Sequence, residues 1–491
     1  MITAEATLHL KNADDAAQIV LDTKALTIES VTSNEQTLDF ILGENDEFLG
    51  QPLSIKITPE ITSVTIKYTT SKEAEALQWL APVQTADKKS PFLFTQSQAI
   101  LARSWVPIQD SPGIRFTYNA EVTVPSDLLA LMSAENPTKK NDAGTYTFKM
   151  EQPIPAYLLA LAVGDLEFKS LGPRSGVYAE PSVIEGAAYE FEDLERMITA
   201  AEELYGPYRW EQYDLIVLPP SFPFGGMENP RLTFATPTIL AGDKSLTSLV
   251  AHELAHSWSG NLVTNATWND FWLNEGFTVY FEQRIMEKLY GRDYSEMLAS
   301  LAAQDLAEEV DEMMKSSQDD TKLKLALDGR NPDDGMTSIA YDKGYLFLRS
   351  LEEEIGREKF DTFLKYHFDA NAFKVMTTEE FVDELKTELY EKNGLTFNSE
   401  KGNTWVYGTG LPANKPQPTS DKFRKVDEQW AKIGTETTLD EINTENWSSH
   451  EWLHFVRNIS ATYTAKQMQE LDEAFNFTQT GNSEVLPEWL V

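Results

Sequence analysis

HELAH, at residues 252–256, is followed after eighteen intervening residues by Glu275. Residues four apart on a helix lie on one face, so His252 and His256 can bind one small cation together. Two histidines and one carboxylate leave the fourth tetrahedral position of Zn²⁺ open to water, as in catalytic rather than structural zinc sites. Glu253 lies between the histidines and can reach such a water molecule. The stretch therefore predicts one catalytic zinc ion with Glu253 as the general base.

A second copy of the pattern, HEWLH, occupies residues 450–454, with Glu473 at the same spacing. On a helical wheel at about 100° per residue, His450 and His454 point away from the apolar stripe that contains Trp452. We therefore expect the second copy to lie on solvent-facing helices and to bind no metal.

The surroundings of the first copy differ from those of the second. Its apolar residues cover one broad side of the expected helix: Val250, Ala251, Leu254, Ala255 and Trp258. Upstream, Asp243, Lys244 and Ser245 supply capping residues. Glu275 belongs to the aromatic-rich stretch DFWLNEGF at residues 270–277, where a buried carboxylate needs a partner. A core helix with two histidines satisfied by ordinary hydrogen bonds is the alternative.

Composition limits the classes of partner. The chain has 491 residues, enough for two to four domains, and 78 acidic residues against 41 basic ones give a formal net charge of -37. This charge argues against nucleic acids and anionic membranes as partners. An acidic cleft would attract a substrate with a positively charged end. The absence of cysteine means that any metal is held by histidine and carboxylate. Neither a signal peptide nor an apolar run of ~20 residues is visible, so we expect a cytoplasmic monomer.

Changes in hydrophobic period predict a multidomain α+β protein. Short alternating segments fill residues 1–167 and indicate an all-β domain. Helical periods dominate from about residue 188 to residue 395, with one strand-like interruption at residues 215–218, and the catalytic domain is expected at residues 168–408. A proline-rich linker is expected at residues 409–418, and a polar helical domain at residues 419–491.

The loop PPSFPFGGMENP, at residues 219–230, precedes the zinc helix. Its two adjacent glycines, Gly225 and Gly226, allow a ligand backbone to approach closely, and the prolines stiffen the loop. Glu228 can bind a cation there. An ordinary turn with an exposed glutamate is the alternative.

Four motifs in order resemble those of the M1 zinc aminopeptidases: GGMEN at 225–229, the zinc motif, WLNEG at 272–276 and YDKG at 341–344. The resemblance covers nearly the whole chain and is greatest to the branch that contains leukotriene A4 hydrolase and bacterial cold-active aminopeptidases. It implies an N-terminal all-β saddle, a thermolysin-like α/β catalytic domain and an all-α C-terminal domain that is only partly present. The implied substrates are peptides with a free N-terminus.

The resemblance also implies roles for individual residues. Glu228 would bind the α-ammonium of the substrate with help from Gln98, and Tyr341 would stabilise the oxyanion. The substrate-binding residues that it implies are Gln96, Gln98, Gly225, Gly226, Met227, Glu228 and Asp333.

These roles make chemical sense without the resemblance. A fixed carboxylate measures the distance from a chain end to the scissile bond, and a charge pair at about 4 Å contributes up to roughly 4 kcal/mol at an effective dielectric near 20. Glu253 can take a proton from water and deliver it to the leaving amine. Tyr341 keeps its proton at neutral pH and can donate a hydrogen bond where negative charge develops. Without the resemblance, a packed core tyrosine is the favoured alternative for Tyr341.

Two further functions are compatible with the sequence. Leukotriene A4 hydrolase has tyrosines where this chain has Met336 and Phe224, whereas Asp333 matches an aspartate linked to its epoxide chemistry. An epoxide hydrolase that is also an aminopeptidase is therefore one alternative. A non-catalytic zinc scaffold is the other, although such a scaffold is expected to lack Glu253 or Tyr341.

Overall fold

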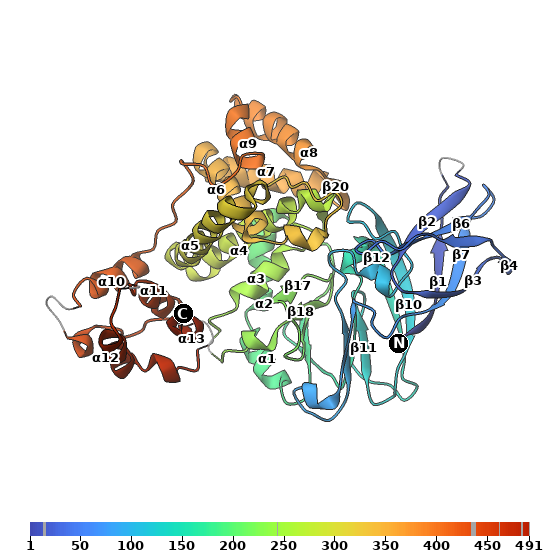
Figure 1. Ribbon diagram of the computed structural model, residues 1–491, viewed down its shortest axis with the longest axis horizontal. Coiled ribbons are helices and arrows are strands. Elements are labelled where there is room, and N and C mark those ends of the chain that lie inside the picture. The colour runs from blue at the N-terminus through green and yellow to red at the C-terminus, as the bar shows by residue number, and fades with distance from the viewer. Residues whose placement is uncertain (13–15, 243, 434–437, 461, 483–484, 491) are drawn as a thin grey trace.

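The computed structural model describes residues 1–12, 16–242, 244–433, 438–460, 462–482 and 485–490. An N-terminal β-rich part, a central α/β part and a C-terminal helical part follow one another along the chain (Figure 1). This arrangement confirms the predicted fold class. No helix in the described part of the chain combines the length and apolar character that crossing a membrane requires.

Two antiparallel sheets form the first half of the β-rich part. Their strands, in spatial order, are β1 (Thr3–His9), β7 (Ser63–Thr69), β3 (Thr27–Ser33) and β4 (Gln36–Thr37), and then β2 (Gln18–Thr23), β6 (Gln51–Lys56) and β5 (Phe40–Leu42). Alternate residues point into a shared core that contains Val31, Leu53 and Ile66. This alternation is the pattern that the sequence predicted for residues 1–167.

The second half of the β-rich part packs against the central part. It contains a two-stranded sheet, β10 (Arg115–Thr123) with β12 (Thr145–Pro155), and a four-stranded sheet, β11 (Leu129–Met132), β13 (Leu161–Gly164), β9 (Phe92–Thr95) and β8 (Leu77–Leu80). Strands β9, β11 and β13 are buried along their whole length and share one hydrophobic core with the central helices. Residues 96–99 follow β9 directly, so this sheet carries them to the central part.

A five-stranded mixed sheet begins the central part. Its order is β14 (Glu167–Ser170), β15 (Ser175–Ala179), β16 (Tyr213–Val217), β18 (Thr233–Ala235) and β17 (Gly226–Met227). Strands β15, β16 and β18 are parallel, whereas β17 runs antiparallel at the end of the sheet. The sequence predicted a single strand-like segment at residues 215–218, so it missed most of this sheet.

Helices make up the rest of the central part. They are α1 (Ile184–Glu190), α2 (Leu194–Tyr205), α3 (Ser248–Ala255), α4 (Trp272–Tyr290), α5 (Arg292–Ser316), α6 (Gly344–Ile355), α7 (Arg357–Ala370), α8 (Thr378–Glu384) and α9 (Ser399–Val406). A π-helical turn, η8 (Ile339–Lys343), leads into α6. Helix α4 packs closely against α6, because a Cβ atom on Gly276 would lie 2.8 Å from the Cα atom of Gly344.

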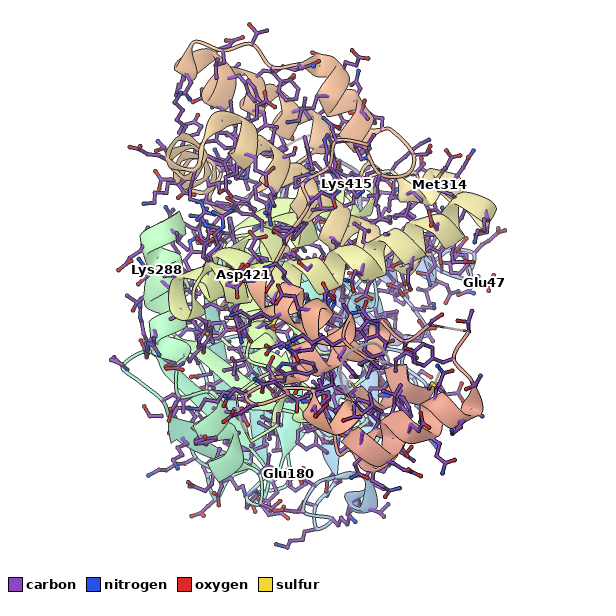
Figure 2. The ribbon with its side chains drawn as sticks, turned by 90° about the vertical axis from the view of Figure 1, so that its left-hand side faces the viewer. Glu47, Glu180, Lys288, Met314, Lys415 and Asp421 are labelled. Atoms are coloured by element: carbon purple, nitrogen blue, oxygen red, sulfur yellow. The ribbon has the colours of Figure 1, made fainter. Side chains whose placement is uncertain are left out.

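The C-terminal part contains α10 (Asp421–Trp430), α11 (Ser449–Arg457), α12 (Ala465–Phe475) and α13 (Val485–Leu490). These helices surround a small core of their own that includes Val426, Phe455 and Leu471. In Figure 2, Asp421 at the start of α10 lies against α5, and its backbone N–H donates to Asp293 Oδ1 at 2.7 Å. The exact limits 1–167, 168–408, 409–418 and 419–491 stay a prediction.

The prediction that both histidines of the second HExxH copy face solvent is wrong for His454. Its ring stacks on Phe423 with centroids 4.1 Å apart, and its Nε2 lies 2.8 Å from Asp427 Oδ1. The helical wheel failed because α11 is buried on two sides, in the C-terminal core and against α5 and α10. Glu473 is exposed on α12, so the described side chains of this copy do not converge on a metal site.

Candidate active site

The zinc helix α3 begins later than its expected capping residues. Asp243 lies outside the described residues, and Lys244 and Ser245 precede the helix, whose first residue is Ser248. The Lys244 backbone N–H donates to Glu190 Oε2 at 2.9 Å, so this segment is held by a neighbouring helix instead of capping α3. Burial of Val250 and Ala251 against the core, rather than a cap, places the helix.

The three predicted metal ligands converge. Glu275 Oε2 lies 3.4 Å from His252 Nε2 and 3.5 Å from His256 Nε2. The three ligand atoms lie within 4.8 Å of one another, and Glu275 Oε2 has no hydrogen-bond partner. Two imidazole nitrogens and a carboxylate oxygen around one point form the donor set of a catalytic zinc site, so these residues fit zinc.

Neighbouring groups orient both histidines with Nε2 towards that point. His252 Nδ1 lies 3.1 Å from Glu282 Oε2, and His256 Nδ1 lies 3.1 Å from the carbonyl oxygen of Ser259. Such outer contacts select the tautomer that presents Nε2 to a metal. Burial lowers the pKa of His256 to about 4 although Glu275 opposes the shift, so this ring is neutral at neutral pH, as a metal ligand must be.

Glu253 lies beside the glycine loop. Its Oε2 is buried without a hydrogen-bond partner, and a Cβ atom on Gly226 would lie 2.2 Å from its Oε1. Burial raises the pKa of Glu253 well above its usual range; His252 opposes this shift, and Glu228 adds to it. Only a glycine at position 226 leaves room for this carboxylate, which stands free to accept a proton.

Glu228 is buried and not the exposed glutamate of an ordinary turn. It is 4% exposed, and its Oε1 has no hydrogen-bond partner. Its carboxylate, that of Glu253 and a nitrogen of His256 also lie within 4.8 Å of one another. Burial raises the pKa of Glu228 to about 7. A second subsite of two carboxyl groups therefore adjoins the predicted metal ligands, and a cationic group is a partner that the free oxygen of Glu228 lacks.

The glycine loop forms an edge strand at this subsite. In β17, Gly226 pairs with Ala235 and Met227 pairs with Phe234, and the carbonyl oxygen of Gly225 accepts a hydrogen bond from Thr236 at 2.9 Å. Strand β17 ends the sheet among the described residues, so no further described strand pairs with its other side.

The N-terminal part contributes side chains from the segment after β9. Gln96 is buried, and its Nε2 lies 3.2 Å from Met227 Sδ. Gln98 is half-buried two residues further on, and the N–H of Ala99 donates to Asp333 Oδ1 at 3.3 Å. Burial raises the pKa of Asp333. The structure thus brings these predicted residues together from three distant parts of the chain.

Tyr341 completes the site from the π-helical turn. Its ring stacks on His252 with centroids 6.1 Å apart and meets Phe271 edge-on at 6.1 Å. Burial raises the pKa of Tyr341 well above 10, and the surrounding carboxylates, first Glu275 and then Glu228, raise it further. The phenol therefore keeps its proton and remains a hydrogen-bond donor.

Sequence reasoning missed several residues that support the site. Glu282 lies two helical turns after Glu275 on the same face of α4, so a helical wheel could have found it. Asn261, whose Nδ2 donates to the carbonyl oxygen of Glu228 at 2.8 Å, carries no such signal. The same holds for Tyr157, which is buried beside Asn274 with 3.4 Å between Tyr157 Oη and Asn274 Nδ2.

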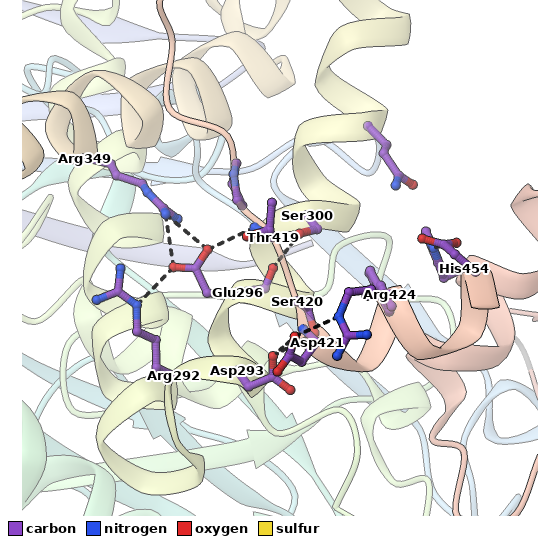
Figure 3. Close-up of a pocket in the computed structure, with 14 residues that line it drawn as sticks. Arg292, Asp293, Glu296, Ser300, Arg349, Thr419, Ser420, Asp421, Arg424 and His454 are labelled. Carbon is purple, nitrogen blue, oxygen red and sulfur yellow. Dashed lines mark hydrogen bonds and ion pairs between the residues drawn. The ribbon is translucent and has the colours of Figure 1, made fainter. Parts of the chain in front are cut away.

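A separate cavity of about 700 Å³ lies between the central and C-terminal parts (Figure 3). Its charged groups largely neutralise one another: Arg349 and Arg292 meet Glu296 at 3.0 and 3.5 Å, and Arg424 meets Asp421 at 3.1 Å. None of the metal-ligating residues lines it, so it is an interdomain cleft distinct from the site around α3.

The chain is similar to proteins of one peptidase family over nearly its whole length. The family model for the peptidase family M1 domain matches residues 189–399, and the model for the peptidase M1 N-terminal domain matches residues 1–158. Leucine aminopeptidase 2 of Yarrowia lipolytica is 38% identical over 99% of this chain and 78% of its own length. Leukotriene A-4 hydrolase of Xenopus laevis is 39% identical over 100% of this chain and 83% of its own. The structure of native leukotriene A4 hydrolase from Saccharomyces cerevisiae superposes with a TM-score of 0.89 at 31% identity, covering 99% of this chain and 82% of that one.

Proposed function

The chain belongs to peptidase family M1. We propose the role that each residue of its site has in the reaction of a zinc aminopeptidase. As a member of that family it is a hydrolase that uses one zinc ion to remove the N-terminal residue from peptides. A non-catalytic scaffold is expected to lack Glu253 or Tyr341, and this chain has both.

His252, His256 and Glu275 would hold the zinc ion. When bound, zinc supplies Lewis-acid chemistry: it polarises the scissile carbonyl and lowers the pKa of a water molecule. Glu282 and the carbonyl oxygen of Ser259 keep the two rings in place, since each lies 3.1 Å from the Nδ1 atom of one histidine.

Glu253 acts as the general base and then as the general acid. It accepts a proton from the attacking water and delivers that proton to the leaving amine. Its free Oε2 and its raised pKa support both steps, because a carboxyl group with a raised pKa is the stronger base. Tyr341 donates a hydrogen bond to the oxygen of the scissile carbonyl as negative charge develops there.

Glu228 makes the enzyme an exopeptidase by binding the α-ammonium of the substrate. The observation that carries this role is a 4% exposed carboxylate with an unpaired oxygen beside the metal ligands. Gln98 assists it, and Gln96 supports Met227. The backbone at Gly225 and Gly226 binds the extended substrate along the open side of β17.

One peptide with a free and with an acetylated N-terminus tests this role. The parent should cleave the free peptide and leave the acetylated one. Glu228→Ala should lower kcat/KM for the free peptide by roughly 10²- to 10³-fold, since an ion pair of this kind contributes up to roughly 4 kcal/mol. Glu473→Ala, which removes an exposed glutamate of the second motif, is the matched control and should behave like the parent. Equal cleavage of both peptides by the parent would refute the proposal.

Epoxide hydrolysis is a second candidate activity. Xenopus laevis leukotriene A-4 hydrolase is similar over the full length of this chain, and Asp333 lies near the site, where its Oδ1 accepts a hydrogen bond from Ala99. Met336 and Phe224 offer no hydroxyl group at two positions where that enzyme type has tyrosine. Turnover of a lipid epoxide by the parent, lost in Asp333→Asn while peptide cleavage remains, would support it. No turnover by the parent would exclude it.

We further propose a cold-adapted monomer in the cytoplasm that binds neither nucleic acid nor anionic membranes. The net charge of -37 supports the monomer and these exclusions, because like-charged copies and polyanions repel one another. A chain without cysteine needs no oxidising compartment for disulfides, which suits the cytoplasm. Light scattering tests the monomer, cell fractionation tests the cytoplasmic location, and a rate–temperature profile tests the cold adaptation.

A further inference from the structure

Asn261 connects the two halves of the site through hydrogen bonds from one residue. Its backbone N–H donates to the carbonyl oxygen of His256 at 3.1 Å, and its side-chain Nδ2 donates to the carbonyl oxygen of Glu228 at 2.8 Å. The side chain is buried, with the residue 2% exposed. Glu228 and His256 are 28 positions apart in the sequence, so the covalent chain does not fix the distance between them. The two hydrogen bonds of Asn261 help to set that distance.

The N-terminal part holds Asn261 in place. Arg115, the first residue of β10, donates from Nη2 to the carbonyl oxygen of Asn261 at 2.6 Å and to that of Pro153 at 2.6 Å. Its Nη1 donates to the Thr264 hydroxyl group. The guanidinium therefore clamps the turn after α3 onto the β-rich part, and the position of Asn261 is fixed from two sides.

We propose that Asn261 is a positioning residue that sets the spacing between the ammonium-binding carboxylate and the metal ligands, and so selects α-amino acyl groups over longer ones. The proposal rests on the proposed role of Glu228 as the ammonium-binding residue. In an α-amino acyl group one carbon separates the ammonium from the scissile carbonyl, whereas a β-amino acyl group has one carbon more.

The physical reason is that catalysis depends steeply on the placement of reacting groups. A displacement of about 1 Å by a change outside the reacting groups can lower the rate by ~10²-fold. Without the Asn261 amide, the backbone at Glu228 loses its hydrogen bond to the turn that follows the zinc helix. The carboxylate can then shift away from the proposed metal ligands. This shift should lower kcat/KM for the substrate with the shorter spacing more than for the substrate with the longer spacing.

Chromogenic amides of L-leucine and of β-homoleucine test the proposal. Asn261→Ala should lower kcat/KM for the leucine amide by roughly 10- to 100-fold. It should lower kcat/KM for the β-homoleucine amide far less, so that the ratio between the two substrates falls. Bound zinc should stay at the parent level. Arg115→Lys, which keeps the charge but loses the forked donor, should shift the ratio in the same direction by a smaller factor and serves if Asn261→Ala does not fold.

Asn265→Ala is the matched control. Asn265 is also a buried asparagine, 1% exposed on the short strand β19 (Val263–Asn265), but its Nδ2 donates to the carbonyl oxygen of Thr267 and not to the site. Its ratio should equal that of the parent. An equal loss for both substrates in Asn261→Ala, or no loss, would overturn the inference. Cleavage of acetylated peptides by the parent would instead overturn the role of Glu228.

Discussion

Glu253 and Glu451 occupy the same position in the two HExxH copies, yet their surroundings give them different chemistry. Glu253 has a buried oxygen without a hydrogen-bond partner beside the metal ligands. Glu451 is also buried, but its Oε2 accepts hydrogen bonds from the N–H and the hydroxyl group of Ser448, at 2.9 and 2.8 Å, in a capping box. At the scale of the residue, the free oxygen decides which glutamate can move a proton.

Glu253→Gln should therefore lower the rate of catalysis strongly while the shape of the site is retained. The amide cannot accept the proton, and loss of general-base catalysis typically costs ~10²–10⁴ in rate. Steady-state kinetics with an aminoacyl chromogenic amide, together with metal analysis, should show a fall in kcat at unchanged zinc content. Glu451→Gln is the control and should keep the parental kcat. A Glu253→Gln enzyme that retains most of its kcat would contradict the assignment.

Metal content should separate the two copies in the same way. We expect one zinc ion per chain, lost in His252→Ala because two of the three ligands cannot retain it. His450→Ala, in the second copy, should keep the full zinc content. Elemental analysis after gel filtration measures both. Two tightly bound zinc ions per parental chain, or one that survives His252→Ala, would show that the wrong residues have been assigned.

Helix packing places Glu275, a proposed metal ligand, relative to Tyr341, the proposed oxyanion residue. Glu275 lies in the first turn of α4, and Tyr341 lies in the π-helical turn before α6. The two elements approach at Gly276 and Gly344, where no side chain separates the backbones. At the scale of the element, two glycines bring the metal ligand and the phenol to one point, since a larger residue would push the helices apart.

Gly276→Ala should destabilise the protein although alanine favours helices. The new Cβ atom would meet the backbone of Gly344 at 2.8 Å, and overpacking of this kind costs typically 1–3 kcal/mol, more than the gain of about 1 kcal/mol in helix propensity. Gly186→Ala in α1 is the control, because nothing lies within 4 Å of its Cβ position, and it should be neutral or stabilising. Thermal unfolding should give a lower midpoint only for Gly276→Ala. Equal midpoints would contradict the close packing.

Lys343 is the last residue of the π-helical turn that contains Tyr341, and it contacts the chain just before the proline-rich linker. It is fully buried, and its Nζ donates to the carbonyl oxygens of Thr321 and Gly408 at 2.6 and 3.0 Å. Burial lowers the pKa of Lys343 to about 7. One buried lysine side chain thus connects the turn after α5, the π-helical turn and the entry to the linker, which lie far apart in the sequence.

The stability of the parent should consequently rise with pH relative to Lys343→Met. The unfolded chain keeps the lysine proton up to its ordinary pKa near 10.5, whereas the folded protein releases it near 7. Between these values the unfolded state binds more protons, so the difference in unfolding free energy should grow by up to about 1.4 kcal/mol per pH unit. Unfolding midpoints at pH 6, 8 and 9.5 measure it. Lys466→Met, at an exposed lysine, should show no such trend, and a flat difference for Lys343→Met would contradict the prediction.

The local spacing of residues was enough to predict that His252, His256 and Glu275 converge, and hydrophobic period predicted the fold class. His252, Glu253 and His256 share a helix, and the geometry of one helix follows from position alone. The β-rich start and the helical remainder followed from hydrophobic period. The short strands β15, β17 and β18 were missed because they have two to five residues and are mostly buried on both faces, so they carry no alternating pattern.

The spacing of two histidines, the proposed general base and a further carboxylate is that of a zinc peptidase, and it can be read without any structure. Only the tertiary structure decided which of two equal HExxH copies has a free buried carboxylate. Only the tertiary structure brings Glu228 beside the metal ligands, and only it joins Asn261 to both. The physical reason is that burial and hydrogen bonding depend on which distant segments pack together. A periodic pattern reports one face of one element and not what covers it, as His454 in its contact with Phe423 shows.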